Sequence, residues 1–66
     1  MSDALIDHAT WLARTYALRG YDAVQLAAAL EVWAQIPTTQ LISADADLNA
    51  AATAEGMPVE DPNAHP

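Results

Sequence analysis

Alanine supplies almost half of the apolar side chains, and this limits the hydrophobic core that the chain can build. The 66 residues include 16 alanines and only 19 larger apolar side chains, with no Phe and no Cys. A chain of this length buries only about 60% of its unfolded surface, and without cysteine no disulfide can compensate. These numbers exclude a large multi-domain architecture and a disulfide scaffold, and they predict a fold of low stability.

The charge is strongly negative, with nine acidic residues against Arg14 and Arg19 and a net charge of −7. Nucleic-acid binding requires several basic residues to neutralise phosphates, so we expect a basic partner or a divalent metal ion instead. The first ten residues carry two acids and no base, unlike a signal peptide. No run reaches the ~18 apolar residues of a membrane helix. The expectation is a soluble, cytoplasmic chain without membrane contact.

Helical periodicity predicts two helices before Pro37. The first is expected to begin after a Ser2 cap and to end at Gly20. The second should begin at Tyr21 or Asp22, with Asp22 and Gln25 in a capping box, and run to Gln35. The apolar stripe predicted for the first helix consists of Leu5, Ile6, Ala9, Leu12, Ala13 and Tyr16.

The second half of the chain predicts a strand, a helix and a short strand. Residues 40–44 are apolar and partly β-branched, as in a buried strand, and Asp45 follows at its carboxyl end. A third helix is expected over residues 47–55, a short strand over 57–59 and a flexible tail over 60–66. This order indicates the α/β class with parallel strands. Two short strands are too few for a typical parallel sheet, so the chain is expected to be part of a larger structure.

Two stretches resemble the PIN-domain family. Residues 18–30, LRGYDAVQLAAAL, resemble a family helix with the pattern lRgyDAvhLAaAl, although Gln25 stands where histidine is common. Residues 41–48, LISADADL, resemble the strand-to-helix pattern lvTaDrrL, and residues 50–59 are similar to the usual ending of the domain. The resemblance implies that residues 1–59 form the C-terminal half of a PIN-like α/β/α sandwich.

The resemblance also implies an activity and a site. PIN domains are metal-dependent nucleases, and many small members are VapC-type ribonucleases, the toxins of type II toxin–antitoxin pairs. Asp22 and Asp45 align with the third and fourth acidic residues that hold Mg²⁺ or Mn²⁺, with Ser43 and Asp47 as supporting residues. The first two acids have no counterpart here, so we expect weak metal binding and an inactive chain. The implied partners are RNA as the substrate, an antitoxin-like protein, and a second copy or the missing N-terminal half.

Each acidic residue also has a purely structural interpretation. Asp22 and Asp45 are both favourable helix caps, and Asp47 suits the first turn of a helix. Two other functions therefore remain open: a non-catalytic interaction module derived from a PIN domain, and an unrelated small acidic helical binder. Because Asp22 begins a helix and Asp45 ends a strand, the metal-site hypothesis predicts that both face one crevice. The third hypothesis predicts no strand at residues 41–44.

Overall fold

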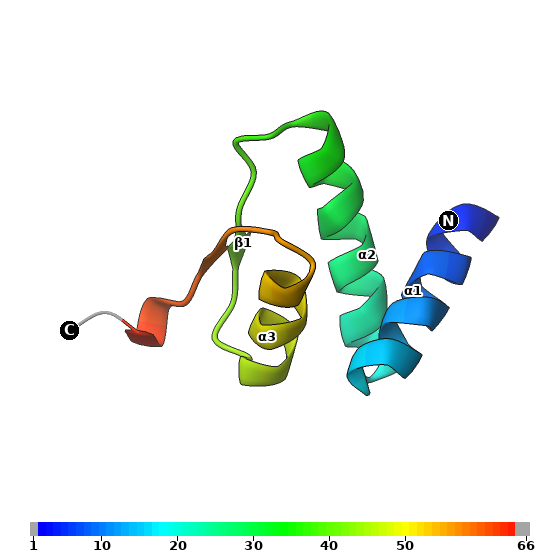
Figure 1. The fold of residues 1–66 in the computed structure, drawn as a ribbon, viewed down its shortest axis with the longest axis horizontal. Coiled ribbons are helices and arrows are strands. Elements are labelled where there is room, and N and C mark those ends of the chain that lie inside the picture. Colours follow the sequence, from blue (N-terminus) through cyan, green and yellow to red (C-terminus); the bar gives the residue numbers. More distant parts are fainter. Residues whose placement is uncertain (1, 65–66) are drawn as a thin grey trace.

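Three helices and a two-stranded parallel sheet form the part of the chain that the computed structural model describes, residues 2–64 (Figure 1). Helix α2 lies between α1 and α3, and the sheet lies beside α3. This arrangement confirms the predicted α/β class. No helix among the described residues is long and apolar enough to cross a membrane. The elements are α1 (Asp3–Tyr16), α2 (Gly20–Gln35), β1 (Leu41–Ile42), α3 (Ala46–Ala54), β2 (Val59–Glu60) and the 3-10 helix η1 (Pro62–Ala64).

Helix α1 begins as predicted but ends earlier. The Ser2 hydroxyl accepts a hydrogen bond from the Leu5 N–H at 3.1 Å, which caps the first turn. The helix ends at Tyr16, and Ala17 adopts the left-handed conformation with φ 55°. The Leu18 N–H then donates to the Ala13 carbonyl at 3.1 Å, as in a Schellman motif. The expectation that Gly20 ends this helix is wrong, because the left-handed residue is an alanine three positions earlier.

Gly20 is instead the first residue of α2, and Arg19 is its N-cap without a side-chain capping bond. The predicted capping box of Asp22 and Gln25 is therefore wrong. Asp22 lies within the first turn, where a carboxylate is still favoured by the positive end of the helix dipole. The helix ends at Gln35, as predicted from Pro37.

The sheet is shorter than predicted. Leu41 pairs with Val59 and Ile42 with Glu60 in parallel register. The Leu41 N–H donates to the Pro58 carbonyl at 2.9 Å, and the Ser43 N–H to the Glu60 carbonyl at 3.1 Å. Leu41 is buried, whereas the Ile42 side chain is 69% exposed. Because Ile42 is exposed, one face of β1 lacks a covering layer among the described residues. This differs from a typical parallel sheet, which has both faces covered.

Helix α3 joins the two strands. It begins at Ala46, one residue before the predicted start, because Asp45 caps it. Gly56, with φ +89°, follows the helix and allows the chain to turn toward β2. Strand β2 ends at Glu60, one residue into the segment expected to be a tail, and η1 follows. The rest of that tail, His65 and Pro66, lies outside the described residues.

Small residues make up much of the core, as the composition suggests. Leu12 and Leu26 are the largest side chains that are fully buried. Ile6, which belongs to the predicted apolar stripe of α1, is 46% exposed, because it lies at the edge of the α1–α2 contact rather than beneath another layer. The buried residues are Ala9, Leu12, Leu18, Ala23, Leu26, Ala27, Leu30, Leu41, Leu48, Ala51, Ala52 and Met57.

A polar contact joins the first and third helices. The Tyr16 hydroxyl, at the end of α1, donates to the Glu55 carboxylate, which follows α3. This hydrogen bond, together with desolvation and the negative charge of Glu55, raises the pKa of Tyr16 above its usual value. The contact therefore requires a protonated tyrosine.

We predict that Ala17→Gly stabilises the chain. A left-handed alanine costs about 1 kcal/mol or more relative to glycine, and this cost outweighs the greater flexibility of glycine in the unfolded chain. Urea denaturation should show a gain of about 0.5–1 kcal/mol. The control Ala50→Gly, at an exposed position within α3, should instead lose about 0.5–1 kcal/mol. A loss of stability in Ala17→Gly would contradict the left-handed cap.

We predict that stability falls at high pH through Tyr16. Because its folded pKa is raised, the stabilisation is fully present below the unfolded pKa of about 10 and is lost as the pH rises through the folded pKa. Urea denaturation between about pH 8 and 11.5 measures this loss. Tyr16→Phe should remove that component of the pH dependence, whereas Tyr21→Phe, at a position 79% exposed, should retain it. Parallel profiles for Tyr16→Phe and the parent chain would refute the assignment.

Candidate functional site

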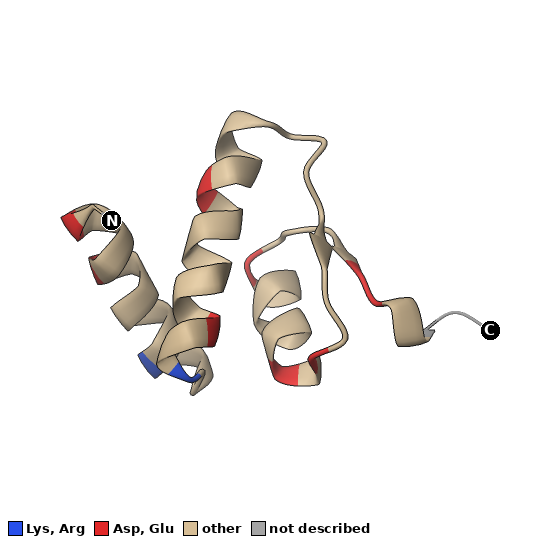
Figure 2. Ribbon diagram, turned by 180° about the vertical axis from the view of Figure 1, so that it is seen from behind, with Lys and Arg blue, Asp and Glu red and all other residues tan. Residues whose placement is uncertain are grey.

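A polar cleft of about 300 Å³ lies between the start of α2 and the start of α3. Asp22 comes from the first turn of α2, Asp45 from the residue before α3, and Asp47 from the first turn of α3. Figure 2 shows acidic segments at the N-terminal ends of both helices and the two basic segments near the α1–α2 junction. The residues lining the cleft are Ala17, Leu18, Arg19, Asp22, Asp45 and Asp47.

The backbone explains why carboxylates 23 residues apart share this cleft. The left-handed turn at Ala17 places the start of α2 directly after the end of α1. Strand β1 then leads into α3, so that Asp45 follows the carboxyl end of the strand. The structure therefore brings Asp22 and Asp45 to one crevice, as the placement of these residues predicts.

Asp45 has a structural role of its own. Its Oδ1 atom accepts a hydrogen bond from the Leu48 N–H at 2.9 Å, and this bond caps α3. The second carboxylate oxygen has no such role in capping. The side chain is exposed, as is that of Asp47, whereas Asp22 is half-buried. The capping interpretation of Asp45 is confirmed, and it leaves one oxygen for a ligand.

Ser43 supports the loop that carries Asp45 and does not line the cleft. Its hydroxyl accepts a hydrogen bond from the Asp45 N–H at 3.1 Å. The neighbouring Asn49 amide donates to the Ser43 carbonyl at 2.8 Å and lies 3.5 Å from Oδ2 of Asp61. These contacts connect the loop after β1 to the segment after β2. Sequence reasoning missed Asn49, although its position four residues after Asp45 places it on the same side of α3.

Arg19 is the other residue that sequence reasoning missed. It lines the same cleft as the three carboxylates and lies three residues before Asp22. The positive ends of the α2 and α3 dipoles lie at the same place. Positive charge and helix dipoles therefore offset the mutual repulsion of the carboxylates. The signal was present in the sequence, because Arg19 is one of only two basic residues.

The donor chemistry of the cleft suits a hard divalent cation, because carboxylate oxygens are the ligands that Mg²⁺ and Mn²⁺ prefer. Within residues 2–64, however, no three His, Asp or Glu side chains lie close enough together to hold a metal ion. The cleft thus fits part of a metal site. Asp22 and Asp45 are the residues that could hold the ion, and water molecules or another polypeptide segment would supply the remaining ligands.

We predict that Asp45 stabilises α3 mainly through its capping hydrogen bond and only slightly through its negative charge. Asparagine keeps an oxygen that can accept the Leu48 N–H, so Asp45→Asn should stay within about 0.5 kcal/mol of the parent in urea denaturation. Asp45→Ala loses the acceptor and should cost about 1 kcal/mol more than Asp45→Asn. Asp47→Asn provides a control for the loss of charge near the dipole. Equal stability of the alanine and asparagine variants would contradict the cap.

Comparison of the chain with protein-family models, with curated proteins and with solved structures finds no match. The cleft and the surrounding surface are therefore the features that indicate a function.

Proposed function

We propose that this chain supplies the C-terminal part of a PIN-type, metal-dependent ribonuclease, similar to the toxins of type II toxin–antitoxin pairs. The observation that supports the proposal is the shared cleft of Asp22 and Asp45. The two residues come from separate elements, and each lies within a motif that resembles the family. The order of α1, α2, β1, α3 and β2 is compatible with the second half of an α/β/α sandwich.

In this proposal the chain provides an incomplete site. Asp22 and Asp45 would bind the cation, Asp47 would add negative charge beside it, and Ser43 would fix the loop through its bond to the Asp45 N–H. The bound ion would supply Lewis-acid activation of a phosphodiester and of water. Because two or three carboxylates leave most of the coordination to water, binding to this chain alone is weak.

The proposal also requires a complementary polypeptide. It would provide the further carboxylates and cover the exposed face of β1 at Ile42, which is 69% exposed. An N-terminal half of the domain or a second copy of the chain would serve this purpose, and an antitoxin-like protein is the expected regulator. RNA is the proposed substrate of the completed site.

The alternative is a non-catalytic interaction module that kept the fold of a PIN remnant. The exposed apolar side chain of Ile42 on β1 is compatible with this alternative, because it offers a surface to a partner. The presence of strand β1 argues against an unrelated helical binder, because that hypothesis predicts no strand at residues 41–44. Metal binding separates the two main candidates, because the interaction module has no need of a cation at Asp22 and Asp45.

We predict weak, site-specific Mn²⁺ binding and no RNA cleavage by the chain alone. Paramagnetic broadening in NMR spectra should be strongest at the starts of α2 and α3, with a Kd of millimolar order. Asp22→Asn and Asp45→Asn should each reduce the broadening, whereas Asp7→Asn, on α1 and outside the cleft, should not.

Two results would contradict this proposal. Equal broadening in Asp22→Asn and Asp7→Asn would remove the metal site and favour the interaction module. Cleavage of a structured RNA by the chain alone, abolished by both cleft substitutions, would show that the site is complete without a partner. Cleavage that appears only after mixing with a polypeptide that carries the missing acidic strand and helix would support it.

A further inference from the structure

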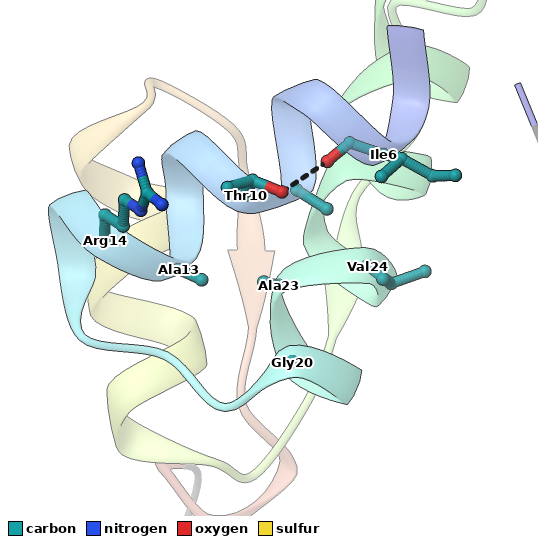
Figure 3. A pocket seen from close by; sticks show the side chains of 8 residues that line it. Ile6, Thr10, Ala13, Arg14, Gly20, Ala23 and Val24 are labelled. Atoms are coloured by element: carbon teal, nitrogen blue, oxygen red, sulfur yellow. Dashed lines mark hydrogen bonds between the residues drawn. The ribbon is translucent and has the colours of Figure 1, made fainter. Parts of the chain in front are cut away.

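A second hollow, separate from the acidic cleft, lies between α1 and the start of α2. It is an apolar groove of about 250 Å³ that shares no lining residue with the cleft (Figure 3). The Ile6 and Val24 side chains lie at one end of the groove, and Arg14 lies at the other (Figure 3). The remaining apolar lining consists of small residues, which leave room for a ligand: Ala9, Ala13, Gly20 and Ala23.

Arg14 is the only charged residue among those that line the groove. The other polar side chain is Thr10, whose hydroxyl donates to the Ile6 carbonyl at 2.9 Å within α1 (Figure 3). The Arg14 side chain is exposed, and its guanidinium has no ion pair or hydrogen bond with another described residue. The free donors at this groove therefore belong to a guanidinium, which pairs best with a group that accepts two parallel hydrogen bonds, such as a carboxylate.

The size of the groove limits the ligand. Ile6 and Arg14 are eight residues apart on α1, which corresponds to about 12 Å along the helix axis. An extended chain of about eight carbon atoms, with C–C bonds of about 1.5 Å, has a comparable length. The volume of about 250 Å³ is smaller than that of pockets for drug-sized molecules, which begin at about 300 Å³. The groove therefore suits an unbranched aliphatic chain with one acidic end.

We propose that this groove binds a medium-chain aliphatic carboxylate, such as octanoate. The carboxylate accepts two hydrogen bonds from the Arg14 guanidinium, and the alkyl chain lies over Ala13 and Ala23. The far end of the alkyl chain contacts Ile6 and Val24. Removal of apolar surface from water supplies most of the affinity, whereas Arg14 selects the acidic head group. Neither role uses a residue of the acidic cleft, so this ligand site does not depend on the proposed metal site.

The net charge of −7 works against an anionic ligand and keeps the affinity low. Arg14 still attracts the carboxylate, because no acidic residue lines the groove and charges farther away than the Debye length, about 8–10 Å, are largely screened. Octanoate has only about ten non-hydrogen atoms, and a ligand of this size in a groove open to solvent binds with a Kd of about 1 mM.

A comparison of head groups tests this proposal. In NMR titrations of the parent chain, octanoate should shift the backbone amide resonances of α1 and of the start of α2. It should bind about fivefold more tightly than octanol, because only the carboxylate accepts charge-assisted hydrogen bonds. Butanoate should bind at least about tenfold more weakly than octanoate, since each lost methylene group costs up to about fourfold in affinity. Arg14→Gln should bind octanoate and octanol equally.

Arg19→Gln is the matched control, because it removes the same charge but lines the cleft; it should keep the preference for octanoate. Gly20→Leu should weaken the binding of both ligands, because Gly20 lines the groove and a Cβ atom added there meets nothing within 4 Å. Far-UV circular dichroism verifies the helix content of each variant. Equal binding of octanoate and octanol by the parent chain, or an unchanged preference in Arg14→Gln, would overturn the proposal. So would resonance shifts centred on α3 and the sheet.

Discussion

The close approach of α2 to both other helices is the contact on which the whole fold depends. It is made by alanines: Ala23 and Ala27 on α2 are at most 1% exposed, and Ala51 and Ala52 on α3 are equally buried. Small side chains allow helix backbones to come near each other, but each buries little apolar area. The fold therefore gains a well-defined helix arrangement at the expense of stability, and Leu12 and Leu26 supply much of the remaining burial.

The acidic cleft is a direct consequence of this helix arrangement. Because α2 and α3 pack together with their first turns at the same end, the acids that favour those helix starts meet in one place. Asp22 interacts with the dipole of α2, and Asp45 caps α3. The same positions that stabilise the helices thus create a concentration of carboxylates. A ligand could therefore be bound by the same carboxylates that already stabilise the two helices.

Local sequence signals predicted the elements better than their boundaries. Proline and periodicity correctly placed the end of α2, and the strand–helix order correctly placed Asp22 and Asp45 at one crevice. The end of α1 was missed because glycine is the usual left-handed residue, whereas here Ala17 takes that conformation. The exposure of Ile6 could not be predicted, because helical spacing identifies an apolar side but not how far a neighbouring helix covers it.

The distribution of charge limits what the cleft can do without a partner. One divalent cation would change the net charge only from −7 to −5, so an RNA would still be repelled at distances within the Debye length, about 8–10 Å. Both arginines lie near the α1–α2 junction, and the described residues contain no other Lys or Arg. In the proposed ribonuclease, the complementary polypeptide would therefore have to bring positive charge as well as carboxylates. In that proposal, a partner that was only acidic would complete the coordination of the metal ion, but the negatively charged RNA would still be repelled.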